Sequence, residues 1–119
     1  MNKNFSIIIP VYNEAENIEN LIKEINFYIN QEKYIFEIII IDDNSSDKTS
    51  QILDIIKNNY NKVSILKNKK NMGQSYSIRK GIENSINNTV VTIDGDGQNN
   101  PRDITKLIEI FFSKKEIKL

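Results

Sequence analysis

Residues 90–96 have the sequence VVTIDGD, in which an apolar β-branched run leads directly into two aspartates. Such a run predicts a buried strand, so Asp94 and Asp96 follow the end of that strand. Residues two apart on extended chain point to the same side. Two like charges on one side cost free energy unless a positive group binds there, and Mg²⁺ or Mn²⁺ prefers oxygen ligands. We therefore expect a divalent cation at this strand end, and that cation would hold phosphate.

Strands and helices alternate around this stretch. The apolar runs predict buried strands, and apolar residues at helical spacing predict helices that turn Ile55, Ile78, Ile82, Ile86, Leu107 and Phe111 inward. This alternation predicts a mostly parallel sheet, and continuous apolar strands predict helices on both of its faces. We expect a Rossmann-like α/β domain over residues 1–113 and a fraying charged tail at 114–119. The predicted strands are 5–10, 35–41, 63–66 and 89–93, and the predicted helices are 14–31, 47–59, 74–87 and 101–113.

Composition excludes several classes of function. The 119 residues suffice for one domain with a core, and 16 basic residues balance 16 acidic ones, unlike a nucleic-acid-binding surface. The chain has no cysteine and no histidine, so disulfides and thiolate zinc sites are excluded. Any general base must be Asp, Glu, Lys or Tyr. Residues 1–4 do not resemble a signal peptide, and no apolar stretch has the length of a membrane span.

Three polar clusters, at 10–14, 42–45 and 94–98, follow predicted strands. Ligands of such sheets bind outside the carboxyl ends of the strands, so the topology brings the three clusters to one edge. Asn13 and Glu16 also fit a capping arrangement for the next helix. Asp42 and Asp43 fit a simple turn. Ser45, Ser46 and Asp47 are better caps for the second helix, which leaves Asp43 to bond a ribose or base.

The loop at 94–98 and the loop at 67–74 each have a second interpretation. The first is also compatible with a polar turn, although Asn100 and Pro101 already supply the start of the last helix. It does not match a calcium-binding EF-hand, because Asn99 and Thr105 stand where Gly and Glu are needed. The second loop is basic and ends in Gly73 before a helix. It either faces a phosphate through its amides or is a solvated connection.

Four segments together resemble family 2 inverting glycosyltransferases of the GT-A fold. They are IIIPVYNEAENI (7–18), EIIIIDDNSSDKTSQIL (37–53), NMGQSYSIRKGI (71–82) and VVTIDGDGQNNPRDITKLI (90–108). The resemblance is to the branch of dolichol-phosphate mannosyltransferase and bacterial polyprenyl-phosphate glycosyltransferases, and it covers essentially the whole chain. Asn44 and Gly95 stand where the family usually has Gly and Ala, and both are expected to be tolerated.

The resemblance implies a role for each matching residue. Pro10, Tyr12 and Glu14 line the nucleotide pocket, and Ile41 and Asp43 contact the base and ribose. The ribose, the sugar and the metal are contacted by Asp94, Gly95 and Asp96. The implied ligands of Mg²⁺ or Mn²⁺ are Asp94, Asp96 and Gln98, and the implied catalytic pair is Asp94 and Asp96.

The resemblance also implies an activity and a location. It implies transfer of a sugar from GDP-mannose or a UDP-sugar to a polyprenyl phosphate, dolichyl or undecaprenyl, at the cytoplasmic face of the membrane in glycan biosynthesis. The chain matches the N-terminal, donor-binding part of that domain, so acceptor-side residues and membrane contacts would lie outside it. A homo-oligomer is possible through an exposed sheet edge.

Two other functions stay open. One is a nucleotide-binding module without catalysis. The other is an Asp-nucleophile phosphohydrolase, which also places Asp-x-Asp after a strand. That alternative needs further acidic residues and a Lys downstream, and it leaves Tyr12 and Glu14 unused.

Overall fold

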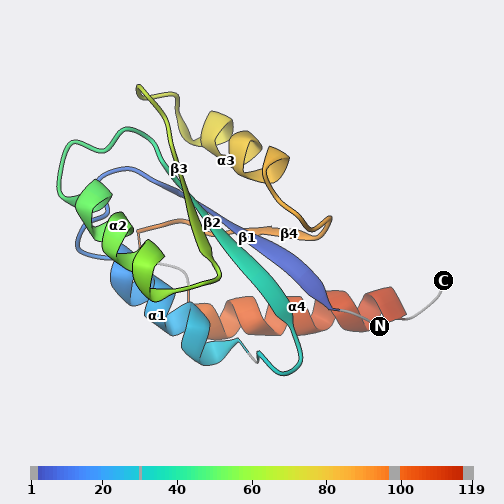
Figure 1. Ribbon diagram of the computed structural model, residues 1–119. Coiled ribbons are helices and arrows are strands. Elements are labelled where there is room, and N and C mark those ends of the chain that lie inside the picture. Colours follow the sequence, from blue (N-terminus) through green and yellow to red (C-terminus); the bar gives the residue numbers. More distant parts are fainter. Residues whose placement is uncertain (1–2, 30, 97–99, 117–119) are drawn as a thin grey trace.

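The computed structural model describes residues 3–29, 31–96 and 100–116. Within these residues, four strands and four helices alternate (Figure 1). All strand pairs are parallel, in the order β3-β2-β1-β4. The predicted α/β architecture is therefore confirmed. The elements are β1 (Asn4–Val11), α1 (Ile18–Tyr28), β2 (Ile35–Asp42), α2 (Thr49–Asn59), β3 (Val63–Lys67), α3 (Gln74–Glu83), β4 (Val90–Thr92) and α4 (Pro101–Glu116).

The strand order creates a switch point between β1 and β4. From β1 the chain builds the sheet outward through β2 to β3, then returns across it to place β4 on the other side of β1. Connections on opposite sides of β1 diverge above its carboxyl end, which leaves a crevice there. The strand order alone therefore creates a crevice where a ligand can bind.

The two faces of the sheet carry cores of different size. The larger core lies between the sheet and α1, α2 and α4, on the face opposite α3 (Figure 1). The smaller core has Ile8, Ile39 and Ile41 beneath α3. Strands β1 and β2 are buried on both faces, as continuous apolar runs predict. The edge strands β3 and β4 are only partly buried, so the prediction of a buried strand is wrong for β4, whose Val90 and Val91 are half-buried and whose Thr92 is exposed.

Helix α3 approaches the sheet through small residues. Ser77 and Gly81, one turn apart, are its buried positions. A Cβ at Gly81 would lie 2.6 Å from Ile8 Cγ2 and 2.7 Å from Ile41 Cδ1, so only glycine permits this distance. The expected inward stripe of isoleucines is wrong here, because Ile82 is exposed.

Helix α3 is also shorter than predicted, and it ends at Glu83. Glu37 Oε2 accepts the N–H of Ile86 at 2.7 Å, and Ser85 Oγ donates to Ser6 Oγ at 2.6 Å. These bonds to the start of the sheet draw the chain out of the helix, and Ile86 is exposed.

The other expected faces and ends are partly wrong. Ile55 on α2 and Leu107 and Phe111 on α4 are exposed, because only part of the apolar stripe on each helix packs against the rest of the protein. Helix α4 continues to Glu116, three residues beyond its predicted end at 113. Lys and Glu are good helix formers, and Lys is favoured in a last turn. Residues 117–119 lie outside the described part of the chain.

Strand β4 lies at a sheet edge. An apolar hollow of about 390 Å³ adjoins it, between Val90 and Val91 of the strand and Leu107 and Phe111 of α4. Among the described residues, no helix is both long and apolar enough to cross a membrane.

Candidate functional site

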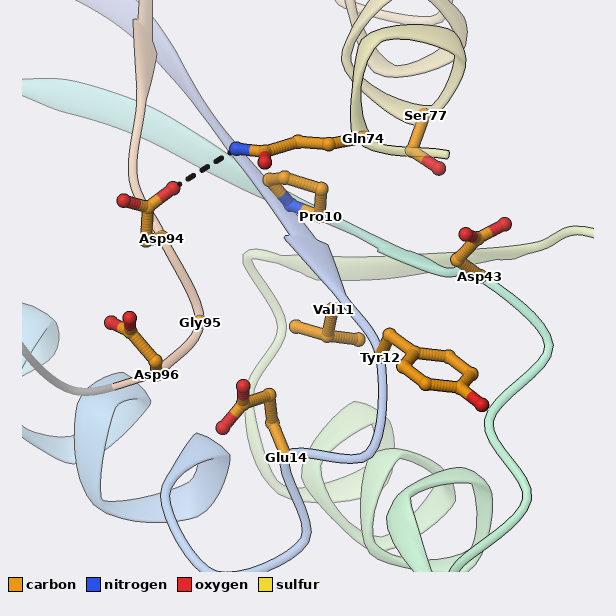
Figure 2. A pocket seen from close by; sticks show the side chains of 10 residues that line it. All are labelled: Pro10, Val11, Tyr12, Glu14, Asp43, Gln74, Ser77, Asp94, Gly95 and Asp96. Atoms are coloured by element: carbon orange, nitrogen blue, oxygen red, sulfur yellow. Dashed lines mark hydrogen bonds between the residues drawn. The ribbon is translucent and has the colours of Figure 1, made fainter. Parts of the chain in front are cut away.

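A cavity of about 320 Å³ opens at the carboxyl ends of the strands, where the strand order predicts a crevice. Figure 2 shows its two sides, with Asp43 and Tyr12 on one, Asp94 and Asp96 on the other, and Pro10 and Val11 between them. Polar clusters from three separate parts of the chain thus meet at one edge, as the sequence predicts. The cavity is lined by Pro10, Val11, Tyr12, Glu14, Asp43, Gln74, Ser77, Asp94, Gly95 and Asp96.

Among the predicted site residues that the structure describes, Ile41 does not line the cavity. Ile41 is fully buried beside Ile8 and Ile39, in the small core beneath α3. It supports the cavity from below, through its strand pairing with Pro10. Gln98 lies outside the described residues.

Asp43 is held by the loop that follows β3. Its Oδ1 accepts the N–H of Met72 at 2.7 Å and an amide hydrogen of Asn68 at 2.8 Å. Its Oδ2 accepts the N–H of Gly73 at 3.0 Å. The chain's own donors therefore occupy most of this carboxylate. A carboxylate offers about four acceptor positions, so one on Oδ2 remains for a base or ribose.

The same contacts keep Asp43 ionised. Burial opposes its charge, since the residue is only 9 % exposed. The N–H groups of Met72 and Gly73 and the amide of Asn68 outweigh that cost, so the pKa of Asp43 lies below its ordinary value.

Asn68 is a residue that the sequence analysis missed. It is 2 % exposed, and its amide nitrogen donates to Asp43 Oδ1 at 2.8 Å and to Ser77 Oγ at 3.0 Å. Its Oδ1 accepts from Lys80 Nζ at 3.1 Å. Asn68 therefore fixes two cavity-lining side chains from behind. The sequence offers no local signal for this role, because all three partners are distant along the chain.

Gln74 and Ser77, on the first turns of α3, also line the cavity. Gln74 Nε2 donates to Asp94 Oδ1 at 3.1 Å and so connects α3 to the loop after β4 (Figure 2). Ser77 Oγ donates to the carbonyl of Gly73 at 3.0 Å. The match of 71–82 to a family motif was the available signal for this segment.

The loop after β4 carries the second aspartate pair. Strand pairing ends at Thr92, and Gly95 and Asp96 lie in a turn rather than on extended chain. Both carboxylates nevertheless line the same cavity, with Asp94 exposed and Asp96 half-buried. A Cβ at Gly95 would lie 2.6 Å from Val11 Cγ1, so this turn packs closely against the end of β1. The usual alanine would require Val11 to shift.

These two carboxylates are hard oxygen donors of the kind that Mg²⁺ and Mn²⁺ prefer. Among residues 3–29, 31–96 and 100–116, no group of three or more acidic, His or Cys side chains could hold a metal ion. The donor set therefore fits an ion that takes its other ligands from phosphate and water.

The loop after β1 closes the cavity from below. Tyr12 is 49 % exposed and lies on the same side of the cavity as Asp43 (Figure 2). Glu14 Oε2 accepts a hydrogen bond from Asn17 Nδ2 at 3.0 Å. The carbonyl of Glu14 accepts the N–H of Ile18 at 3.0 Å, so α1 begins four residues later than predicted.

Asn13 does not cap α1 as expected. It is left-handed, with φ of 54°, and its Oδ1 accepts the N–H groups of Ser46 at 2.8 Å and Asp47 at 3.3 Å. Its own N–H donates to Ser45 Oγ at 3.0 Å. Asp47 does serve the start of α2, since its Oδ1 accepts the N–H of Thr49 at 2.9 Å. The loops after β1 and β2 are thus bonded to each other.

The curated relatives of this chain include polyprenyl-phosphate sugar transferases. It is 38 % identical over 106 residues to an undecaprenyl-phosphate 4-deoxy-4-formamido-L-arabinose transferase of Pseudomonas fluorescens, covering 87 % of this chain and 31 % of that protein. A protein of the same name from Pectobacterium carotovorum is 37 % identical over 109 residues, covering 90 % of this chain and 33 % of its own length. The chain therefore spans about a third of the relatives that it matches.

Solved structures share the fold. Staphylococcus aureus TarS in complex with UDP-GlcNAc superposes with a TM-score of 0.75 at 24 % identity, covering 96 % of this chain and 32 % of that one. The mannosyltransferase PcManGT of Pyrobaculum calidifontis, in complex with GDP-Man and Mn²⁺, has a TM-score of 0.68 at 21 % identity, covering 77 % and 27 %. The expected Rossmann-like GT-A fold is confirmed by these likenesses.

The sequence model described as glycosyl transferase family 2 matches residues 6–117, nearly the whole chain. This chain belongs to glycosyl transferase family 2.

Proposed function

We propose that this chain is the donor-binding part of a metal-dependent, inverting glycosyltransferase that moves a sugar from a nucleotide-sugar to a polyprenyl phosphate. The observation that carries the proposal is the cavity at the switch point of the sheet, because it gathers residues from all the motifs of the resemblance. The names of the relatives, which are undecaprenyl-phosphate transferases, support this acceptor class.

The two sides of the cavity suit different parts of the donor. The Asp43 and Tyr12 side would take the base and ribose, with the remaining acceptor position on Asp43 Oδ2 for an N–H or O–H donor. The Asp94 and Asp96 side would take the pyrophosphate and sugar. Asp94, Asp96 and Gln98 would hold Mg²⁺ or Mn²⁺, and the bound ion would stabilise the charge of the departing nucleoside diphosphate.

The reaction proposed is a single displacement. An oxygen of the acceptor phosphate bonds to the anomeric carbon as the bond from that carbon to the donor phosphate breaks, which inverts the configuration. The acceptor oxygen is already anionic, so the absence of histidine from the sequence does not prevent the attack. The cytoplasmic face of a membrane is the proposed location.

The test is a thermal unfolding screen of the chain with GDP, UDP, ADP and CDP, each with and without Mn²⁺. A nucleotide at about 100 times its Kd should stabilise the chain by about 2.7 kcal/mol. We expect stabilisation by GDP or UDP that depends on Mn²⁺, and the effective nucleotide would identify the donor class. A cooperative transition that no nucleotide shifts would contradict the proposal.

A pair of variants separates the site from general charge. Asp96→Ala should abolish the Mn²⁺-dependent shift and leave the transition without ligand unchanged. Asp54→Ala, an exposed aspartate on α2, should keep the shift. If Asp96→Ala binds nucleotide and Mn²⁺ as the parent chain does, the metal assignment is wrong.

Two alternatives give different results. A nucleotide-binding module would bind the nucleotide but, within the full-length protein, transfer no sugar. An Asp-nucleophile phosphohydrolase would retain a phosphate mimic such as beryllofluoride on Asp94 without any nucleoside. The cavity favours the transferase, because Tyr12 and Glu14 line it together with the aspartates.

A further inference from the structure

A second hollow, of about 540 Å³, lies beside the loop that joins β3 to α3. Strand β3 is the sheet edge opposite β4, and Figure 1 shows this loop at the outer end of the molecule, next to α3. The donor cavity lies on the inner side of the same loop, where Asp43 accepts the N–H groups of Met72 and Gly73. The hollow is lined by Lys67, Asn68, Lys69, Lys70, Met72, Tyr76 and Lys80.

The hollow concentrates positive charge. Its lining contains lysines at four positions and no acidic residue, in a chain whose 16 basic and 16 acidic residues balance overall. Like charges brought together around a concave surface raise the local potential and favour an anion. The charge is therefore a local feature of this surface rather than a property of the composition.

Two of the four ammonium groups are held in place. Lys80 Nζ donates to the carbonyl of Lys67 at 3.2 Å and to Asn68 Oδ1 at 3.1 Å, and Lys67 Nζ donates to Ser50 Oγ at 3.2 Å. An ammonium has three hydrogens, so both groups keep donors for a ligand. Lys69 and Lys70 are exposed on the loop between them.

Apolar surface accompanies this charge. Met72 is 39 % and Tyr76 is 41 % exposed, and both line the hollow. A free phosphate ion would gain nothing from the thioether of Met72 or from the ring face of Tyr76. Lysines beside a tyrosine and an apolar side chain are instead suited to the interface of a bilayer, where the ring lies at headgroup level.

We propose that this hollow binds the phosphate headgroups of an anionic bilayer. The lysines contact the lipid phosphates, and Met72 and Tyr76 rest on the apolar part of the interface. The site requires no nucleotide, so it goes beyond the proposed function and stands or fails separately from it.

Docking at this hollow would orient the donor cavity. The two depressions share the loop as a wall, and Asn68 bonds Lys80 on one side and Asp43 and Ser77 on the other. Both lie at the carboxyl end of the sheet. The donor cavity would consequently lie beside the membrane surface, where a membrane-borne acceptor is presented.

The test is co-sedimentation of the chain with vesicles, without nucleotide. Vesicles of phosphatidylcholine containing about 30 mol % phosphatidylglycerol should bind the chain, and pure phosphatidylcholine should not. Each lysine near an anionic surface contributes about a fivefold gain in partitioning, so Lys69→Glu with Lys70→Glu should reduce binding at least tenfold. Both positions are exposed, and an unchanged circular dichroism spectrum would verify the fold.

Matched controls make the result decisive. Lys57→Glu with Lys106→Glu makes the same change of charge at exposed positions on α2 and α4, and should retain binding. Tyr76→Ser, which keeps every lysine, should weaken binding severalfold. Equal loss in both double variants, or no binding to the anionic vesicles, would overturn the proposal. So would thermal stabilisation by inorganic phosphate, lost in Lys69→Glu with Lys70→Glu, without vesicle binding, because the site would then take a free anion.

Discussion

Two pairs of aspartates follow strands of this sheet, Asp42 and Asp43 at the end of β2 and Asp94 and Asp96 after β4. The first pair is buried, and three of its four carboxylate oxygens accept bonds from the chain: Asp42 Oδ1 from Ser45 at 3.0 Å, and both oxygens of Asp43, from Met72 and Gly73. In the second pair Asp94 is exposed and Asp96 is half-buried. Both pairs follow apolar runs in the sequence, yet the first forms part of the cavity wall and the second presents its charge to that cavity.

The largest expected effect on the free energy of unfolding comes from removing the Asp43 carboxylate, which forms part of the cavity wall. Asp43→Ala would leave the N–H groups of Met72 and Gly73 and the amide of Asn68 without their acceptor, and should lower the free energy of unfolding by about 3 kcal/mol. Urea unfolding measures this change. Asp94→Ala should change it by no more than about 0.5 kcal/mol, because surface substitutions have small effects. Equal losses would remove the distinction between the two pairs.

A smaller loss is expected behind the wall. Asn68→Ala removes a donor to Asp43, a donor to Ser77 and an acceptor for Lys80, and should cost about 2 kcal/mol in the same urea experiment. Asn58→Ala, at an exposed position of α2, is the control and should cost less than about 0.5 kcal/mol. If the two variants unfold alike, Asn68 does not support the cavity.

The comparison also predicts a dependence on pH. The pKa of Asp43 is lowered in the folded chain, so its carboxylate stabilises the fold fully above the unfolded-state pKa of about 4. This contribution is lost as the pH falls through the lower folded-state pKa. The stability difference between the parent chain and Asp43→Asn, measured by urea unfolding from pH 7 to pH 2, should therefore be constant near neutrality and shrink below about pH 4. A difference that is the same at both ends would contradict this account.

The smallest effect is expected where the two sides meet. Gln74 Nε2 donates to the exposed Asp94 at 3.1 Å, and water can replace this bond. Gln74→Ala should therefore change the unfolding free energy by no more than about 0.5 kcal/mol in urea. A loss of about 2 kcal/mol would mean that the loop after β4 is as firmly built as the one after β3.

Sequence patterns predicted the larger features of this molecule well. Apolar runs located the four strands that the structure describes, three of them followed by polar clusters. The alternation of elements implied the parallel sheet and the convergence of those clusters. The same patterns failed on helix faces, because an apolar stripe does not say how closely a helix approaches its sheet. Gly81 allows α3 to pack through small residues, and Ile82 is left exposed as a result.

The details of the site were less predictable. The position of Asp43 after a strand predicts a bond to a ribose or base. It does not predict that Asp43 also accepts the N–H groups of Met72 and Gly73, which come from a loop about 30 residues away. Asn68 gave no signal, because its role depends on three side chains that only the folded chain brings together. The hydrogen-bond partners of buried polar groups are brought together only in the folded chain, so the spacing of these residues in the sequence does not predict them.

Asn13 has a consequence for the thermodynamics of association. Its Oδ1 accepts the N–H groups of Ser46 and Asp47, and its own N–H donates to Ser45 Oγ, so the loop after β1 is bonded to the loop after β2 before any ligand arrives. Ordering a loop during binding commonly consumes part of the interaction free energy. Here that cost on the Tyr12 and Asp43 side is already met by folding, so the affinity of a ligand for that side should reflect its contacts almost undiminished.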